Sequence, residues 1–169
     1  MYVRNHIKFI KNHDAGKNPE REWDPWNGFR CGMMSTNNRI VSIVDDELDI
    51  TELFHDALCG ISGISVFTFN DPILSLKHFT NNKDEYVLVI SDLRMPGLNG
   101  LELLKKVKNL NRYVRTILMS AFEVENNKVF LNYINEGIID KFIQKPITLN
   151  HLCQEVNNQV HAYELRMNE

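Results

Sequence analysis

The sequence predicts an α/β domain in which a five-stranded parallel sheet carries helices on both faces. Two observations support this fold class. From Arg39 onward, short runs of β-branched and other apolar residues alternate with segments whose apolar residues recur at helical spacing. Such alternation implies parallel strands joined by right-handed crossovers. In addition, carboxylate, hydroxyl or ammonium side chains stand at the ends of four of the five predicted strands, and open α/β sheets place functional groups at the carboxyl ends of strands.

The first part of the domain is predicted as strand, helix and strand. Arg39–Val44 is a β-branched run typical of a strand, and Ser65–Phe69 is a second, short strand. A helix is predicted between them over Glu47–Leu58. Its apolar stripe consists of Leu48, Ile50, Leu53, Phe54, Ala57 and Leu58.

Asp71 and Pro72 mark the start of the second helix, which is predicted to run through Phe79. Aspartate is a favoured N-cap, and proline fits the first helical position. The third strand is predicted over Tyr86–Ser91. The helix after it spans Gly100–Leu110 and should turn inward Leu101, Leu104, Val107 and Leu110.

The last part of the domain repeats the pattern twice. The fourth strand is predicted over Arg115–Met119, followed by a helix from about Val124 to Glu136 that Gly137 ends as a C-cap. Lys141–Gln144 is the fifth strand. Thr148 should cap the final helix, whose buried face is expected to comprise Leu149, Leu152, Val156 and Val160.

The first 38 residues differ from the rest of the chain. They are rich in Asn, Gly and Pro and show no sustained periodicity, which favours a disordered or loosely docked extension. The alternative is an interaction arm anchored by Trp23, Trp26 and Phe29. We therefore expect an N-terminal extension over 1–38, one domain over 39–164, and a short tail over 165–169.

Composition narrows the class of protein. Hydrophobic residues make up 43% and charged residues 24%, as in ordinary globular proteins, and the net charge of -3 argues against nucleic acid as a partner. Cys31, Cys59 and Cys153 are widely spaced, which fits reduced thiols in a cytoplasmic protein. No apolar stretch approaches the roughly 20 residues that span a bilayer, and no secretion signal is evident, so no membrane association is expected.

Two sets of charged or titratable residues are interpreted as unremarkable. Lys105, Lys106 and Lys108 should lie on the outer face of an amphipathic helix and promote solubility. The six histidines show no ligand spacing and are expected at the surface or at edges: His6, His13, His55, His78, His151 and His161.

The residues at the strand ends predict a site for a divalent metal and a phosphoryl group. Asp45 and Asp46 follow the first strand and Asp92 follows the third, while Ser120 and Lys145 end the fourth and fifth. In the flavodoxin-like strand order 2-1-3-4-5, the first and third strands are neighbours, which brings the three carboxylates together. Carboxylate oxygens suit Mg²⁺, and a nearby ammonium relieves their mutual repulsion.

At this point the sequence resembles a family. From about Arg39 to Glu164, the chain is similar to the CheY-like receiver domain of two-component response regulators. The matching motifs stand in order at strand ends: Val44-Asp45-Asp46-Glu47, Ser91-Asp92-Leu93-Arg94-Met95-Pro96-Gly97-Leu98-Asn99-Gly100, Met119-Ser120-Ala121 and Phe142-Ile143-Gln144-Lys145-Pro146.

The resemblance implies a role for each acidic residue. Asp92 is expected to be the phospho-acceptor, whose carboxylate also binds the metal. Asp46 is expected to bind Mg²⁺ directly and Asp45 through water, with the backbone carbonyl of Arg94 as a further ligand. Lys145 is expected to pair with the phosphoryl group.

The resemblance also implies a switch. Ser120 is expected to supply a hydroxyl that moves toward the phosphoryl group, and Phe142 an aromatic side chain that responds. The Lys145-Pro146 bond is expected to be cis. The chain departs from the family in two places: Gly137 lies one residue further from Lys145 than usual, and the segment from Ser120 to Gly137 is about two residues longer.

The expected function is that of a stand-alone receiver, because only one helix and a short tail follow Pro146. It would take a phosphoryl group from a histidine kinase or a histidine phosphotransfer protein onto Asp92. It would then signal by contact with an unknown downstream protein, or pass the phosphoryl group onward. One alternative is a Mg²⁺-dependent phosphatase or phosphotransferase acting on small molecules. A second alternative is a degenerate receiver that binds a partner constitutively.

Overall fold

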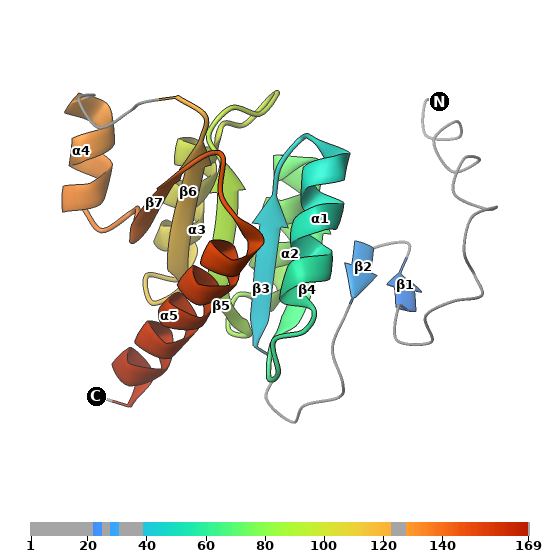
Figure 1. The fold of residues 1–169 in the computed structure, drawn as a ribbon. Coiled ribbons are helices and arrows are strands. Elements are labelled where there is room, and N and C mark those ends of the chain that lie inside the picture. Colours follow the sequence, from blue (N-terminus) through green and yellow to red (C-terminus); the bar gives the residue numbers. More distant parts are fainter. Residues whose placement is uncertain (1–21, 25–27, 31–38, 123–127, 169) are drawn as a thin grey trace.

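The computed structural model describes residues 22–24, 28–30, 39–122 and 128–168. Its main sheet has five strands in the order β4-β3-β5-β6-β7, and every neighbouring pair is parallel (Figure 1). Their bounds are Ile40–Val44 for β3, Ser65–Phe69 for β4, Tyr86–Asp92 for β5, Arg115–Ser120 for β6 and Lys141–Gln144 for β7. The predicted order 2-1-3-4-5 is therefore confirmed.

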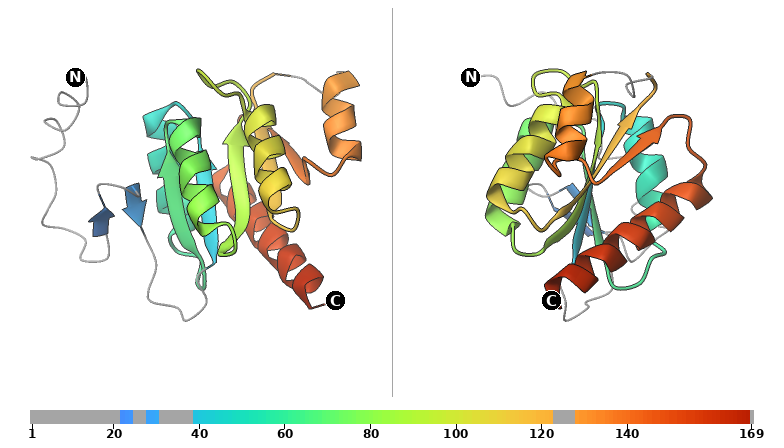
Figure 2. Two further views of the ribbon diagram at one scale, coloured as in Figure 1. Left: turned by 180° about the vertical axis from the view of Figure 1, so that it is seen from behind. Right: turned by 90° about the vertical axis from the view of Figure 1, so that its left-hand side faces the viewer.

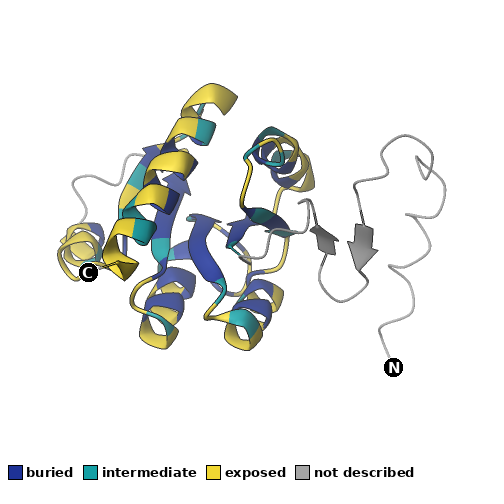
Figure 3. Cartoon of the chain, turned by 90° about the horizontal axis from the view of Figure 1, so that it is seen from below, coloured by how far each residue is buried: buried dark blue, intermediate teal, exposed yellow. Residues whose placement is uncertain are grey.

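Helices cover both faces of this sheet (Figure 2). Their bounds are Leu48–Leu58 for α1, Pro72–Asn82 for α2, Gly100–Leu110 for α3, Lys128–Asn135 for α4 and Leu149–Met167 for α5. Apolar residues of α1 and α5 form one core with the sheet, while those of α2, α3 and α4 form a second core on the other face. Figure 3 shows the buried strands between the two helical layers. No helix among the described residues combines the length and apolar character needed to cross a bilayer.

Local sequence signals set several helix ends as predicted. The Asp71 carboxylate accepts a hydrogen bond from the Ile73 amide at 2.7 Å, and the Thr148 hydroxyl accepts one from the His151 amide at 3.3 Å. Gly137 ends α4 with a φ of +69°, a conformation that favours glycine. Its amide and that of Ile138 donate to the carbonyls of Ile134 and Tyr133, which is the hydrogen-bond pattern of a Schellman cap.

The start of α4 lies partly outside the described residues. The helix was expected from about Val124, and residues 123–127 are not described. In the N-terminal extension, Glu22–Asp24 (β1) and Gly28–Arg30 (β2) form an antiparallel pair in which Trp23 lies opposite Phe29. The rest of 1–38 lies outside the described residues, so the character expected for this extension stays a prediction.

The predicted buried faces need correction at four leucines. Leu48 and Leu149 are exposed because each stands in the first turn of its helix, beyond the end of the preceding strand. Leu53 and Leu110 are exposed because other residues of their helices face the sheet. In α1 these are Thr51, Phe54, His55 and Leu58; in α3 they are Gly100, Leu103, Leu104, Val107 and Lys108.

Three polar residues expected at the surface are buried. His55 and His78 lie inside the protein, and the Nδ1 atom of His78 is 2.7 Å from the hydroxyl of Tyr86. Lys108 is also buried, with its ammonium 2.6 Å from the Asp140 carboxylate. His78 and Lys108 are paired with groups on other elements, which a periodicity of apolar residues does not reveal. His55 instead contacts Asp56 and Cys59, its neighbours at the end of α1.

Candidate functional site

The candidate site lies at the carboxyl edge of the sheet. Parallel register aligns Val44 of β3 with Ser91 of β5, so Asp45 and Asp92 leave adjacent strands at the same level. In the same way Ser120 of β6 aligns with Gln144 of β7, which places Lys145 just beyond the end of the sheet. Asp45, Asp92 and Lys145 are thereby brought into contact, whereas Asp46 is exposed and does not complete a cluster of three carboxylates within the described residues.

Lys145 bridges two buried carboxylates. Its Nζ atom is 2.7 Å from Asp45 Oδ2 and 2.6 Å from Asp92 Oδ1. Burial by itself lowers the pKa of Lys145, but hydrogen bonds to Asp45 and Asp92 and their negative charges outweigh this effect, so its pKa lies above the usual value. The ammonium is therefore charged at neutral pH and holds the two carboxylates close together.

Backbone amides hold the second oxygen of each carboxylate. Asp92 Oδ2 accepts from the Arg94 amide at 2.7 Å, and Asp45 Oδ1 accepts from the Glu47 amide at 3.0 Å. These bonds fix the orientation of both carboxyl groups before any ligand binds. Fixed geometry of this kind is what a phosphoryl-transfer site requires, because the protein contributes mainly positioning and charge.

Asn70 also supports the site, and this residue was not predicted. Its side-chain amide donates to the backbone carbonyl of Asp45 at 2.9 Å and to the Thr51 hydroxyl at 3.1 Å. It thus links the ends of β3 and β4 to α1. The available signal was its position directly after the second strand, the same type of position that identified Asp45 and Asp92.

The donor set fits a hard divalent cation such as Mg²⁺. Asp45, Asp46 and Asp92 provide three carboxylates against the one ammonium of Lys145, which leaves net negative charge at this edge. Asp46 is exposed, and within the described residues no three acidic, histidine or cysteine side chains already form a cluster that could hold a metal. Mg²⁺ accepts such an open arrangement because it keeps several waters and needs few protein oxygens, including a carbonyl such as that of Arg94.

Ser120 and Phe142 lie on neighbouring strands next to this site. The buried Ser120 hydroxyl accepts a hydrogen bond from the Phe122 amide at 3.0 Å, and the Ser120 carbonyl accepts one from the Lys145 amide at 2.8 Å. Phe142 is half-buried and meets Phe130 of α4 edge to face, with ring centroids 5.0 Å apart. The Lys145-Pro146 bond is cis, as expected.

One contact beside the site was not predicted. The Arg94 guanidinium lies over the Phe122 ring, 3.6 Å from its centroid. The backbone amides of these two residues hold the Asp92 carboxylate and the Ser120 hydroxyl, respectively. The stack therefore joins the loops that carry the two groups, and no local pattern relates residues from separate loops.

Comparison with known proteins gives a consistent result. The sequence profile of the response regulator receiver domain matches residues 41–157. The chain is 29% identical over 125 residues to the DNA-binding transcriptional regulator NtrC of Escherichia coli K12, covering 74% of this chain and 25% of that protein. It is also 29% identical over 85 residues to the sporulation initiation phosphotransferase F of Bacillus subtilis, covering 50% of this chain and 66% of that protein.

Solved structures give the same result as the sequence comparison. A response regulator receiver domain protein from Clostridium thermocellum superposes with a TM-score of 0.66 at 26% identity, covering 76% of this chain and 98% of that one. The chain spans about a quarter of the length of the NtrC proteins that it matches, so their shared region is one domain.

Proposed function

Because this chain belongs to the response regulator receiver family of two-component systems, we propose that it is a phosphorylatable switch whose acceptor is Asp92. The donor is the phosphohistidine of a histidine kinase or of a histidine phosphotransfer protein. The observation that carries this proposal is the Asp92 carboxylate, buried at the end of β5 and held by the Lys145 ammonium and the Arg94 amide.

The transfer exchanges one bond for another. A carboxylate oxygen of Asp92 forms a bond to phosphorus, the phosphorus–nitrogen bond breaks, and its electron pair stays on the histidine nitrogen. Lys145 is placed to balance the charge of the phosphoryl oxygens, and backbone amides to donate to them. Asp45, Asp46, Asp92 and the Arg94 carbonyl would hold Mg²⁺, which supplies further charge neutralisation when bound.

Signalling follows from the position of Ser120. Its hydroxyl accepts from the Phe122 amide in the structure. A phosphoryl oxygen on Asp92 offers it a stronger, charge-assisted partner. Movement of Ser120 would free space beside β7 and allow Phe142 to repack against Phe130 of α4. A downstream protein that reads this surface, or onward transfer of the phosphoryl group, would then provide the output.

Two alternatives receive less support. A small-molecule phosphatase needs a second acid or base close after the nucleophile, and here Leu93 and Arg94 follow Asp92. A degenerate receiver has no use for an intact set of Asp45, Asp92 and Lys145, which the structure brings into contact. We therefore propose that the chain catalyses only its own phosphorylation and dephosphorylation.

Intact-mass spectrometry tests the proposal. The protein is incubated with acetyl phosphate and Mg²⁺, and we expect it to gain the mass of one phosphoryl group. Asp92→Asn should gain none, and Asp46→Asn should gain it much more slowly. Asp84→Asn is the matched control, because Asp84 is exposed and precedes β5 at the opposite edge of the sheet.

Three results would contradict the proposal. A phosphoryl gain by Asp92→Asn would place the acceptor elsewhere. No gain by the wild-type protein, with acetyl phosphate or with a phosphorylated kinase, would favour the degenerate receiver. Steady release of phosphate from small phosphate esters would favour the phosphatase.

A further inference from the structure

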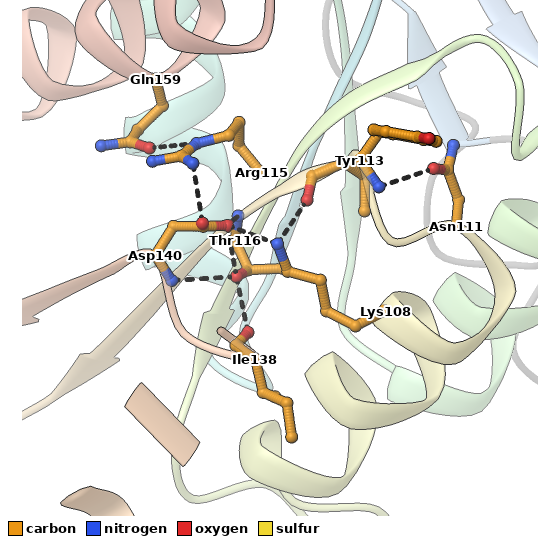
Figure 4. A network of polar contacts seen from close by, with 9 residues as sticks. Lys108, Asn111, Tyr113, Arg115, Thr116, Ile138, Asp140 and Gln159 are labelled. Carbon is orange, nitrogen blue, oxygen red and sulfur yellow. Dashed lines mark hydrogen bonds and ion pairs between the residues drawn. The ribbon is translucent and has the colours of Figure 1, made fainter. Parts of the chain in front are cut away.

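A buried polar network lies at the edge of the sheet opposite the acidic site (Figure 4). Its centre is Asp140, which directly precedes β7 and whose side chain is only 7% exposed. Oδ2 of Asp140 accepts from Lys108 Nζ at 2.6 Å and from the Thr116 amide at 2.9 Å, while Oδ1 lies 2.8 Å from a guanidinium nitrogen of Arg115. We call Asp140, Lys108, Arg115 and Thr116 the Asp140 clamp.

The clamp ties the α4–β7 connection to three other elements. Lys108 belongs to α3, and Arg115 and Thr116 begin β6. The Thr116 hydroxyl donates to the carbonyl of Ile138 at 2.7 Å, one residue beyond the glycine that ends α4. Arg115 Nε also donates to the Gln159 side chain of α5 at 2.8 Å. The C-terminal end of α4 is thereby fixed to both helical layers.

Separating this network is unfavourable for an electrostatic reason. One carboxylate lies between two cations inside the protein, and Lys108 also donates to the Val114 carbonyl at 2.8 Å. Burial lowers the pKa of Lys108, although the hydrogen bond and charge of Asp140 oppose this. If the α4–β7 connection opened locally, the Asp140 carboxylate and the two cations would lose their partners while still partly shielded from water. This loss makes local opening unfavourable.

The clamp lies close to Phe142, the aromatic residue of the proposed switch. Asp140 lies two residues before Phe142, whose ring contacts Phe130 in α4. We propose that the Asp140 clamp is a fixed pivot that holds the C-terminal end of α4 in both phosphorylation states and suppresses movement of α4 while Asp92 is unphosphorylated. This inference rests on the proposed function, because the pivot regulates the same site.

Hydrogen exchange followed by NMR on the full chain tests the pivot without phosphorylation. Asp140→Asn keeps the shape of the side chain and removes its charge. Lys108→Met keeps the buried stem and removes the ammonium, leaving Asp140 paired with Arg115. In both variants we expect amides of residues 128–141 to exchange at least about tenfold faster relative to amides of α1 and α2. Glu164→Gln, which removes an ion pair with Arg39 outside the clamp, should not change this ratio.

The outcomes are distinct. Equal acceleration throughout the domain would show that the network contributes only global stability, and no acceleration would show that it does not restrain α4. Either result overturns the proposal. If Asp140→Asn does not fold, Lys108→Met and the matched Arg115→Met still decide the question, because each leaves Asp140 with one cationic partner.

Phosphorylation separates this inference from the function on which it rests. In the wild-type protein treated with acetyl phosphate and Mg²⁺, we expect faster exchange in α4 while residues 138–141 remain protected. A wild-type protein that gains no phosphoryl mass would refute the proposed function. The exchange comparison among unphosphorylated proteins would still decide whether the clamp restrains α4.

Discussion

Lys145 balances charge at the point where two buried carboxylates face each other. Because its ammonium contacts both Asp45 and Asp92, its removal leaves two anions close together with no cation between them. Loss of one partner from a buried ion pair is strongly destabilising, since the remaining charge stays desolvated. The residue that we propose to neutralise the phosphoryl group therefore also stabilises the unphosphorylated protein.

We predict that Lys145→Met lowers the free energy of unfolding at pH 7 by about 3 kcal/mol. Addition of Mg²⁺ should restore part of this loss, because a divalent cation can replace the missing charge. Urea unfolding with and without Mg²⁺ measures both effects. Lys106→Met, on the exposed face of α3, should leave the unfolding free energy within about 0.5 kcal/mol of the wild type. If Lys145→Met has the wild-type free energy of unfolding and Mg²⁺ does not change it, the assignment of the site is contradicted.

Tyr86 provides a second test at the residue scale, through pH. Burial raises the pKa of its hydroxyl well above the usual value of 10.0. The unfolded chain therefore loses this proton at lower pH than the folded protein does. The stability that Tyr86 contributes is complete below pH 10 and is lost as the pH rises toward its pKa in the folded state, at up to about 1.4 kcal/mol per pH unit.

Tyr86→Phe should reduce the decrease of the unfolding free energy with pH above about pH 10. At pH 7 the variant should be less stable by about 1 kcal/mol, because the hydrogen bond with His78 is lost. Urea unfolding at several pH values between 7 and 11 measures both quantities. Tyr113→Phe, at an exposed tyrosine, should keep the wild-type slope. An identical slope in all three proteins would show that Tyr86 does not control alkaline unfolding.

At the scale of elements, α3 approaches the end of β5 more closely than a side chain allows. A Cβ atom built on Gly100 would lie 2.1 Å from the backbone oxygen of Asp92 and 3.0 Å from a methyl carbon of Leu118. Asn99 caps the helix at this point by accepting from the Glu102 amide at 3.0 Å. The first turn of α3 therefore packs directly against the end of β5, which carries the proposed acceptor Asp92.

Gly100→Ala should consequently destabilise the domain by about 1–3 kcal/mol, because backbone atoms must shift to admit the methyl group. The shift should also slow phosphorylation, since it displaces Asp92. Gly60→Ala is the control: a Cβ atom there meets nothing within 4 Å, and the backbone needs no positive φ. Thermal unfolding and the rate of phosphoryl gain give the two readouts. Equal behaviour of both variants would show that the contact at Gly100 is not tight.

Elements governed by local chemistry were predictable from the sequence. Asp71 and Pro72 start α2, where the Asp71 carboxylate caps the helix, and Gly137 ends α4 with a positive φ. Both predicted helix ends are confirmed. Burial of Lys108 was not predictable in this way, because its partner Asp140 lies 32 residues away. In a helical pattern, a lysine at the edge of the apolar row is indistinguishable from a solvated one.

At the scale of the whole molecule, topology explains why the candidate site could be anticipated. Parallel strands in the order 2-1-3-4-5 bring their carboxyl ends to one edge, so Asp45, Asp92 and Lys145 had to converge. Topology does not specify which atoms touch. The bridge made by Lys145 and the stack of Arg94 on Phe122 depend on side-chain conformations that only the packed structure fixes.

The proposed function requires a signal to pass from this edge to the surface formed by α4, β7 and α5. We propose Ser120 as the first link, because its hydroxyl is held by the Phe122 amide and its strand lies beside the strand of Phe142. A hydrogen bond to a charged group contributes roughly 1.5–3 kcal/mol, which shifts a two-state equilibrium by about tenfold to a hundredfold.

Ser120→Ala should therefore still gain a phosphoryl group, though more slowly, and should show smaller chemical-shift changes at Lys141, Phe142 and α4. Ser120→Thr is the matched control, since it keeps a hydroxyl and should keep the distal response. NMR spectra before and after addition of acetyl phosphate and Mg²⁺ provide the measurement. If Ser120→Ala gives the full wild-type set of distal shifts, the hydroxyl is not the relay. The Arg94–Phe122 stack would then be the first alternative route to test, because it also joins the acceptor loop to the segment that leads into α4.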